Sequence, residues 1–540
     1  MGEAMRGKTA LISVFHKTGI VEFAKALVAL GWDILASGGT ARVLSEAGIA
    51  VRDVATLVGG NAILEHRVVT LSRKVHAGLL ADYNKPAQMH EMELFEIPVI
   101  DLVCVDLYPL EEEIAKSGAT REDVIEKTDV GGPTMLRSAA KGRRIVIADP
   151  ADRTRVIEWL QAGKPDEDSF VTALVAKAEF VVAKYCLASA RYHSAGGYDG
   201  LLGRRVQTCL YGENGYQVPA ALFSADSGDP LALENLFLCT DTLPSFNNLC
   251  DLDRLLHTTT HIAAGDEVNF GKVRKIAVVV KHGNACGAAI GEDEYDVLRR
   301  MVRGDLRAIT GGVVMTNFSI DEKGAEILLA DGMSEGVRRL LDTIAAPEIT
   351  EAAIEMLRRK KDKCRILVNP ALSSLEVESI DTAPIIRPVR GGFLMQPNYT
   401  FILNLADPDL KKISEASPKE EQDLVFAWAI EATSTSNTIT IVRDGTLLGN
   451  GVGRQDRVGA AELAIKIARD AGHEVEGSVA ASDSFFPFRD GPNVLMDAGV
   501  RTIFASSGSV RDGEVKAACE ENGVSLYLIP DKKGRGFFNH

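Results

Sequence analysis

Residues 276–280 place the strongest constraint on how this chain can fold. All five are apolar and four of them are β-branched, with no alternation of apolar and polar positions. A strand of this composition is buried on both faces, as in a sheet that helices cover on each side. Lys281 and His282 follow it directly, and Gly283 and Gly287 let the chain pass close to a ligand. The pair predicts a proton-transfer site in which the lysine charge favours a neutral, basic imidazole. The alternative is a strand that ends in two solvated residues.

The length of the chain, 540 residues, exceeds what one hydrophobic core supports and predicts about two to four domains. Hydrophobic residues make up 46% and charged residues 25%, which is typical of a globular protein. The formal net charge of -15 argues against a general surface for nucleic acid or anionic membranes. A small anionic substrate is compatible with this charge, because helix N-termini and a few cations bind phosphate locally.

The eight cysteines are scattered, with no Cys-x-x-Cys spacing and no His-x-Glu partner. They are typical of reduced thiols and not of a zinc site, so we expect no metal. The first residues are polar, and no later stretch is apolar over the length needed to span a membrane. We therefore expect a cytoplasmic protein with small-molecule substrates and without a nucleic-acid or membrane partner.

Two strand–turn–helix units open the chain. Residues 9–14 form an apolar strand that leads through Lys17 into an amphipathic helix, and residues 32–36 form a strand that leads through residues 37–40 into another. Glycines and hydroxyl residues at a helix N-terminus form a phosphate cradle of backbone N–H groups. One such sequence alone indicates only a turn. Because the ends of adjacent parallel strands lie side by side, two of them together predict a phosphate site.

Short motifs follow one another between Ser13 and Lys141. They are Ser13-Val14-x-x-Lys17-Thr18-Gly19, Ala36-Ser-Gly-Gly-Thr-Ala41, Arg67-Val68-x-Thr70-Leu71, His76-Ala-Gly78, Leu107-Tyr-Pro109, and Asp129-Val-Gly-Gly132 with Ala139-Ala-Lys141. In this order they resemble the inosine monophosphate (IMP) cyclohydrolase domain of the bifunctional PurH family, a domain similar in fold to methylglyoxal synthase.

The second half of the chain carries further motifs. They are Tyr211-Gly-Glu-Asn214 with Gln217, Asn247-Asn-Leu with Asp251, Lys281-His282 with Gly287, Gly391-Gly-x-Leu-x-Gln396, Asp423-Leu-x-Phe-Ala-Trp428, Ser436-Asn437, Ser482-Asp-x-Phe-Phe-Pro-Phe-Arg-Asp490, Ser507-Gly-Ser509 with Arg511-Asp512, and Phe538-x-His540. They resemble the aminoimidazole-carboxamide ribotide (AICAR) transformylase of the same family. The resemblance thus covers nearly the whole chain.

The resemblance implies an α/β fold class with two domains. Residues 1–198 would form a methylglyoxal-synthase-like domain with a parallel sheet, and residues 199–540 a transformylase region of two cytidine-deaminase-like α/β units without their zinc. The boundary falls where glycines around residues 196–200 interrupt a helical pattern. It also implies a homodimer, since the transformylase site of the family is built between subunits.

The implied function is the last two steps of IMP biosynthesis. A formyl group passes from the co-substrate 10-formyltetrahydrofolate to the 5-amino group of AICAR, and formyl-AICAR then closes its ring with loss of water. The amine is a weak nucleophile that must lose a proton as it attacks, so the resemblance assigns His282 as base, Lys281 as charge stabiliser and Asn437 as amide partner of the tetrahedral intermediate. The implied substrate contacts of this site are Tyr211, Asp483, Phe485, Phe486 and Arg457.

Ring closure depends mainly on positioning, because the formamide already lies next to its nucleophile. The resemblance places Asp129, Lys141 and Tyr108 at the catalytic positions of this reaction. It places the phosphate and ribose contacts at Lys17, Ser37, Gly38, Gly39, Thr40, Arg67 and Thr70.

Four positions depart from the family pattern. Val69 stands where relatives have a cyclohydrolase lysine, Leu210 and Gly536 stand where relatives have phosphate-binding arginines, and Gly312 stands where some relatives place an acid. Two lost phosphate contacts cost on the order of 3–6 kcal/mol if nothing replaces them.

The departures leave three alternatives open. The chain could keep one activity only, use another formyl donor, or be a regulatory protein that binds a phosphate ligand. The retained Lys281, His282 and Asn437 argue against a regulatory protein, because a sensor needs neither a base nor an oxyanion donor.

Overall fold

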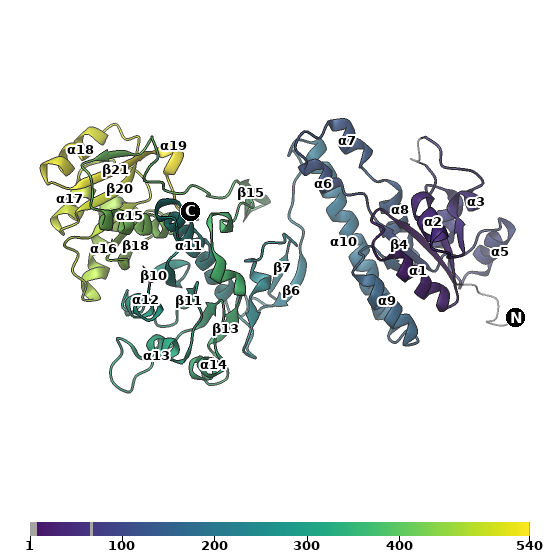
Figure 1. Cartoon of the computed structure of the whole chain (residues 1–540), viewed down its shortest axis with the longest axis horizontal. Helices are drawn as coiled ribbons and strands as arrows, with labels where there is room; N and C mark the ends of the chain where they lie inside the picture. Colours follow the sequence, from purple (N-terminus) through teal and green to yellow (C-terminus); the bar gives the residue numbers. More distant parts are fainter. Residues whose placement is uncertain (1–7, 65–67, 539–540) are drawn as a thin grey trace. The chain divides into compact units, whose positions relative to one another are not determined.

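The computed structural model describes residues 8–64 and 68–538, and the chain forms two compact units, Met1–Leu202 and Gly203–His540 (Figure 1). The division lies close to the domain boundary that the sequence predicts. Each unit has its own sheet and its own hydrophobic core.

The first unit is built on a five-stranded sheet with the order β3-β2-β1-β4-β5. All neighbouring strands in it are parallel, which confirms the predicted parallel sheet. The strand order reverses between β1 and β4, so the loops after these two strands open a crevice at the carboxyl edge of the sheet. The strands are β1 (Lys8–Val14), β2 (Trp32–Ala36), β3 (Val51–Asp53), β4 (Leu102–Asp106) and β5 (Ile145–Ile147).

Helices cover this sheet and bury the apolar sides of its strands in one core cluster. The long helix α10 packs against α8 and β5. The helices are α1 (Ile20–Ala29), α2 (Gly38–Glu46), α3 (Val54–Val58), α4 (Arg73–Leu80), α5 (Pro86–Leu94), α6 (Leu110–Ala115), α7 (Arg121–Glu126), α8 (Gly131–Lys141), α9 (Asp152–Gln161) and α10 (Glu167–His193).

The second unit is built on a twelve-stranded mixed sheet with the order β16-β21-β20-β19-β17-β18-β10-β9-β11-β12-β13-β8. Its strands are β8 (Phe237–Leu238), β9 (Lys275–Lys281), β10 (Asn284–Gly291), β11 (Val313–Thr316), β12 (Thr343–Ala346), β13 (Arg365–Val368), β16 (Lys411–Ile413), β17 (Ile439–Arg443), β18 (Thr446–Gly451), β19 (Val479–Ser482), β20 (Thr502–Ser507) and β21 (Ser525–Pro530). Its helices are α11 (Phe246–Phe270), α12 (Glu294–Met301), α13 (Glu322–Ala330), α14 (Glu351–Leu357), α15 (Pro418–Glu431), α16 (Arg457–Asp470), α17 (Asp490–Asp497), α18 (Asp512–Glu521) and α19 (Asp531–Gly534).

Strand β9 is buried on both faces, as its unalternating apolar sequence predicts. Ile276, Val278 and Val280 belong to the core cluster that contains α11 and α15, whereas Ala277 and Val279 belong to the cluster that contains α12 to α14. Successive side chains of a strand point to opposite faces, so these helices lie on opposite sides of the sheet.

The second unit contains one topological pattern twice. A helix precedes an antiparallel hairpin and three parallel strands in both copies, first as α11, β9–β10 and β11 to β13, and then as α15, β17–β18 and β19 to β21. Even the hairpin turns correspond. Asp251 of α11 accepts a hydrogen bond from Gly283 N (2.7 Å), and Asp423 of α15 accepts one from Gly445 N (2.6 Å). The repeat agrees with two related α/β units.

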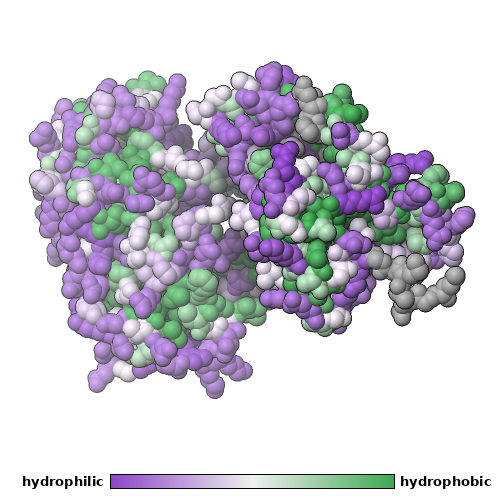
Figure 2. Space-filling view, turned by 45° about the vertical axis from the view of Figure 1, so that its right-hand side comes forward, coloured by the Kyte–Doolittle hydropathy of each residue, from purple (hydrophilic) through white to green (hydrophobic). Residues whose placement is uncertain are grey.

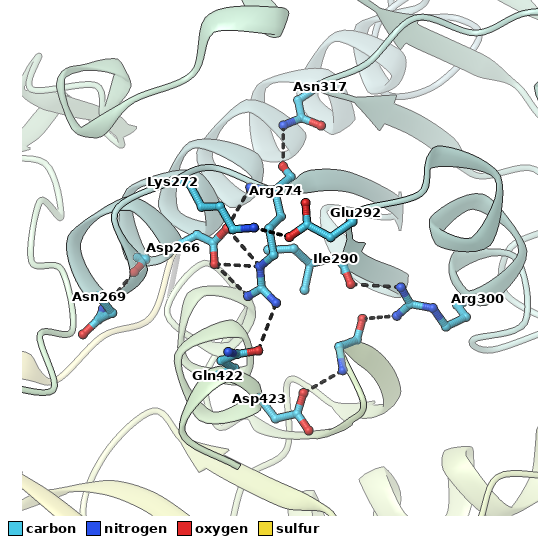
Figure 3. A network of polar contacts seen from close by, with 12 residues as sticks. Asp266, Asn269, Lys272, Arg274, Ile290, Glu292, Arg300, Asn317, Gln422 and Asp423 are labelled. Carbon is cyan, nitrogen blue, oxygen red and sulfur yellow. Dashed lines mark hydrogen bonds and ion pairs between the residues drawn. The ribbon is translucent and has the colours of Figure 1, made fainter. Parts of the chain in front are cut away.

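A polar network fixes the base of the β9–β10 hairpin (Figure 3). The Arg274 guanidinium pairs with Asp266 of α11 at 2.7 Å, and the two side chains are only 14% and 2% exposed. Asn317 accepts a hydrogen bond from Ile276 N (2.7 Å) and donates one to Arg274 O (2.9 Å). Arg300 connects the two repeats, because it donates hydrogen bonds to Ile290 O of β10 (3.0 Å) and to Gly445 O in the turn between β17 and β18 (2.8 Å).

Two small hairpins stand apart from the main sheet of this unit, β6 (Arg204–Thr208) with β7 (Ala221–Ser224) and β14 (Ile385–Val389) with β15 (Gly392–Gln396). Polar residues dominate the face in Figure 2, with smaller apolar areas between them. Among the described residues, no helix is long and apolar enough to span a membrane.

Candidate functional site

The ends of β1 and β2 meet in the first unit, as the paired turn sequences predict. The hydroxyl oxygens of Ser13 and Ser37 lie 2.8 Å apart, and the Thr40 hydroxyl lies 3.3 Å from both N and O of Val14. Gly38 and Gly39 begin helix α2, and a Cβ atom built on either would meet nothing within 4 Å. The residues predicted to bind phosphate therefore gather around open space at a helix N-terminus.

Lys17 adds a cation to this cradle. Its ammonium group donates hydrogen bonds to Val14 O and to Phe15 O, the second at 3.1 Å. Burial lowers the pKa of Lys17, and the charge of Asp106 partly opposes this effect. A half-buried ammonium of this kind has few water molecules to lose when an anion binds.

Asp129, Tyr108 and Thr70 lie together at the N-terminus of α8. Gly132 N donates a hydrogen bond to Asp129 Oδ1 (2.8 Å). A Cβ atom on Gly131 would lie 2.6 Å from Thr70 Oγ1, and one on Gly132 would lie 2.4 Å from Asp129 Oδ2. The two glycines of the Asp129-Val-Gly-Gly132 motif are thus needed to let these side chains approach the helix.

The electrostatic setting of Asp129 suits proton transfer. Burial raises the pKa of its carboxyl group, although hydrogen bonds from the backbone N–H groups of Gly132, Tyr108 and Gly131 oppose the shift. Burial and the nearby Asp129 charge also raise the pKa of Tyr108. A carboxyl group with a raised pKa holds its proton more readily near neutral pH.

Lys141 does not lie beside Asp129 within this chain. It is the exposed last residue of α8, whose first turn follows Asp129, and a helical rise of 1.5 Å per residue separates the two ends by roughly 15 Å. Val69, at the position of the missing lysine, packs partly buried against the core. The Arg73 guanidinium lies 4.6 Å from the Phe95 ring. Arg67 lies outside the described residues.

In the second unit, Lys281 is the last residue of β9, and His282 follows it in the tight turn between β9 and β10. His282 and Gly283 have φ angles of 53° and 73°, as a two-residue hairpin turn requires. Lys281 Nζ donates a hydrogen bond to Thr310 O (2.8 Å), and the His282 side chain is exposed. The imidazole is therefore accessible to a ligand.

Asn284 connects this turn to the segment that carries Asn437. Its side chain accepts a hydrogen bond from Thr435 N (2.9 Å) and donates one to His282 O (3.2 Å). Asn437 itself donates from Nδ2 to Arg454 O (2.9 Å). The structure thus links the His282 turn to the segment of the other repeat that carries Asn437. The sequence alone did not single out Asn284, because its role depends on a residue 151 positions away.

Asp483 and Arg457 lie beneath the same segment. Asp483 is 1% exposed and accepts hydrogen bonds from Ser436 Oγ (2.5 Å) and Arg457 Nη2 (3.1 Å). Burial raises the pKa of Asp483, and the Arg457 charge opposes this. Both side chains therefore help to hold the segment of Ser436 and Asn437 in place. Their direct contact with substrate stays a prediction.

Tyr211 directly precedes Gly212, which lines a cavity of about 440 Å³. Phe246 N donates a hydrogen bond to Tyr211 O (3.0 Å), which ties the loop to the start of α11. The same helix carries Asp251, which holds the turn at Gly283. The cavity is lined by Gly212, Glu213, Gln217, Val218, Pro219, Ala220, Ala221 and Phe246.

The phenylalanines of the Phe-Phe-Pro-Phe sequence, two of them implied substrate contacts, are only partly accessible. Phe486 is 2% exposed and belongs to the core, whereas Phe485 is partly exposed and Phe488 is 49% exposed. Phe486 therefore serves packing in this chain. Phe485 remains the predicted side chain that a flat ring could reach.

An arginine that the sequence alone did not identify lies next to the His282 turn. Arg254 donates from Nη1 to Thr433 O (2.8 Å), and its guanidinium carbon lies 3.9 Å from the Phe538 ring centre. At Gly536, a Cβ atom would lie 2.4 Å from the Tyr399 hydroxyl, so no larger residue fits there without rearrangement.

Two α/β units, each with titratable side chains at strand ends, are typical of an enzyme. Residues 139–467 match the family model described as AICARFT/IMPCHase bienzyme, and residues 19–134 match the MGS-like domain. Since the first match covers more than half of the chain, the chain belongs to the AICARFT/IMPCHase bienzyme family. The enzyme therefore carries both AICAR transformylase and IMP cyclohydrolase activities of IMP biosynthesis, as the sequence motifs predict.

A solved structure described as "Crystal structure of ForH" is also similar. It is 36% identical to this chain, and the match covers 35% of this chain and 98% of that one, with a TM-score of 0.32. No group of three or more potential metal-ligating side chains occurs within residues 8–64 and 68–538.

Proposed function

We propose that the second unit, residues 203–540, carries out formyl transfer from 10-formyltetrahydrofolate to AICAR at the β9–β10 turn. The observation that carries this proposal is the link between the His282 turn and the segment of Thr435 and Asn437 through Asn284, which accepts from Thr435 N at 2.9 Å and donates to His282 O at 3.2 Å. One segment offers a base and the other an amide donor. A link of this kind between the two segments favours such a reaction, since positioning supplies much of the rate enhancement.

In the proposed reaction, His282 accepts a proton from the 5-amino group of AICAR as the nitrogen attacks the formyl carbon. Asn437 donates a hydrogen bond to the oxygen that becomes negatively charged, and Lys281 stabilises the same charge or the leaving folate nitrogen. The hydrogen bond from Lys281 Nζ to Thr310 O orients the ammonium group before substrate binds. The Arg254 guanidinium supplies a further cation near the turn, where relatives rely on arginines at positions 210 and 536.

We propose further that the first unit closes the ring of formyl-AICAR. Lys17 and the N-terminal turn of α2 bind the phosphate, with Ser37, Gly38, Gly39 and Thr40 around it, and Thr70 contacts the ribose side. Asp129 and Tyr108 move the protons. The raised pKa of Asp129 supports this role, because loss of water requires a group that can donate a proton near neutral pH. Arg67 and Lys141 are also proposed to contact the substrate.

The proposed working form is a cytoplasmic homodimer. Hairpin β14–β15 supports the dimer, because Phe393, Leu394 and Met395 are 43%, 62% and 45% exposed on a two-stranded ribbon. Such a ribbon is marginally stable alone, and exposed apolar residues in a group mark an interaction surface. The cysteines are free thiols, in keeping with a reducing compartment.

The proposal is tested by two assays on the purified full chain. AICAR with 10-formyltetrahydrofolate is followed by the absorbance change of IMP formation, and synthetic formyl-AICAR is followed separately. We expect IMP in both. Turnover of AICAR only with a formyl donor other than the folate would contradict the proposed co-substrate, and accumulation of formyl-AICAR without IMP would contradict the proposed role of the first unit.

A further inference from the structure

The hydroxyl group of Tyr185 lies between two backbone groups of the segment that precedes α8. It accepts a hydrogen bond from Asp129 N (2.6 Å) and donates one to Lys127 O (3.0 Å). Tyr185 belongs to α10, which packs against α8 but follows it only after β5 and α9. One side chain from a distant helix thus binds both ends of a three-residue segment.

The backbone of that segment is otherwise held by contacts within the first unit that are close in sequence. It connects α7 to α8. Two of its other contacts run back into α7, with Lys127 N bonded to Asp123 O (3.1 Å) and the Thr128 hydroxyl bonded to Val124 O (3.0 Å). Its side chains also contact the Phe15 ring, through the Lys127 ammonium, and Gly132 N, through Asp129 Oδ1. Tyr185 is the described contact that ties its backbone to α10. This tie holds the Asp129 backbone against α10, in addition to the hydrogen bond between its carboxylate and Gly132 N of α8.

The Asp129 carboxylate has little room for displacement. Its Oδ1 accepts from Gly132 N at 2.8 Å, and its Oδ2 lies where even a Cβ atom on Gly132 would clash. A backbone shift of a fraction of an ångström would break the hydrogen bond or move the carboxylate away from Tyr108. Misplacement of a reacting group by about 1 Å can cost on the order of 10²-fold in rate.

We propose that Tyr185 is a positioning residue for ring closure, which holds the backbone of Asp129 so that its carboxyl group meets the substrate in a productive orientation. The inference rests on the proposed role of Asp129. Tyr185 itself does not touch the substrate. Its hydroxyl acts only through the hydrogen bonds to Asp129 N and Lys127 O.

The test uses Tyr185→Phe, which removes one oxygen atom and keeps the ring. Tyr192→Phe, on the same helix, is the matched control, since the described contact of Tyr192 is a ring contact with His193. Ring closure is measured with formyl-AICAR. We expect kcat of Tyr185→Phe to fall about 10- to 100-fold with little change in KM, while Tyr192→Phe stays at the wild-type rate. Formyl transfer by the same samples confirms that the variants are folded.

The double variant separates positioning from general stabilisation. If Tyr185 acts through Asp129, then Tyr185→Phe adds no further loss of kcat in an Asp129→Asn background. Multiplying losses would overturn the inference, as would wild-type kcat in Tyr185→Phe or an equal loss of both activities. If Asp129→Asn alone keeps full ring closure, then the proposed site fails instead, and the two failures remain distinguishable.

Discussion

Val69 is the residue at which this chain departs most from the cyclohydrolase pattern. Its side chain is partly buried against the core, and the nearby Arg73 guanidinium lies over the Phe95 ring. Ring closure still proceeds, because intramolecular positioning supplies most of the acceleration. We expect it to lack one charge stabiliser.

Restoring that stabiliser gives the first prediction. Val69→Lys should raise the rate of ring closure, by up to about 10²-fold, because a lysine stem can lie along the apolar surface while its ammonium reaches the site. Formyl transfer should not change. Arg73→Ala and Lys74→Ala are measured alongside. If Val69→Lys has no effect and one of these alanine variants abolishes closure, then that cation already performs the role.

Glu431 provides a prediction about stability and pH. Its carboxyl group is 0% exposed, and neither oxygen has a hydrogen-bond partner among residues 8–64 and 68–538. Burial raises its pKa well above 4.5, the Asp483 charge adds to this, and the Arg457 charge opposes it. The folded chain therefore keeps a proton that the unfolded chain releases as the pH rises above 4.5.

The sign of the effect follows from this proton. Where the folded state binds more protons than the unfolded state, the free energy of unfolding decreases as pH increases. Glu431→Gln keeps the shape and cannot ionise, so its free energy of unfolding should depend less on pH than that of the wild type between about pH 5 and about pH 8. Urea unfolding at several pH values checks this. Parallel curves for the two proteins would show that Glu431 is ionised in the folded state.

At the scale of elements, the hairpin β9–β10 owes its position to the network in Figure 3. Arg274 and Asp266 form a buried ion pair, whereas Lys272 and Glu292 form an ion pair whose side chains are 57% and 71% exposed. Removal of one member of a buried pair leaves an uncompensated charge. The two pairs thus differ in their expected contribution to the free energy of unfolding, although both lie at the base of the same hairpin.

This difference predicts the outcome of two matched substitutions. Arg274→Met should lower the free energy of unfolding by about 3–5 kcal/mol. Lys272→Met, the control, should change it by less than about 1 kcal/mol. Denaturant unfolding measures both. Equal effects would contradict the assignment of Arg274 as the buried anchor of the hairpin.

How far the sequence predicts the structure differs between the two sites. The unalternating run in β9 predicts a doubly buried strand, and the turn residues after β1 and β2 predict a shared cradle, because both follow from local patterns and parallel-strand geometry. Asn284 and Tyr185 could not be found in this way. Their hydrogen bonds reach residues 151 and 56 positions away, and only the fold shows which backbone groups they meet.

The repeat of hairpin turns in the second unit has only a short signature in the sequence, a valine, a basic residue, one variable residue and a glycine. Asp251 and Asp423 each hold a hairpin turn, but the first turn carries Lys281 and His282 and the second carries Arg443 and Asp444. The two copies share the backbone hydrogen bond to an aspartate and the basic residue and glycine of the turn, and they differ at the residue between these two, His282 or Asp444. The first turn carries residues suited to proton transfer. In the second turn, Asp444 forms an ion pair with Lys419 of α15.

At the scale of the whole molecule, the exposed hairpin β14–β15 predicts self-association. Leu394 is 62% exposed on this hairpin. A charge at the centre of an apolar contact is costly, so Leu394→Asp should shift the molecular mass measured by light scattering from dimer toward monomer. Val510→Asp, at a fully exposed side chain outside the hairpin, is the control and should remain dimeric. A wild-type monomer with full activity would contradict the proposed dimer.

The central claim is that the two reactions occur at separate sites in separate units of one chain, and paired single variants test it most directly. His282→Ala should lower formyl transfer about 10²- to 10⁴-fold and leave the closure of added formyl-AICAR unchanged. Asp129→Asn should do the reverse. Loss of both activities in either variant, or near-wild-type transfer in His282→Ala, would contradict the account.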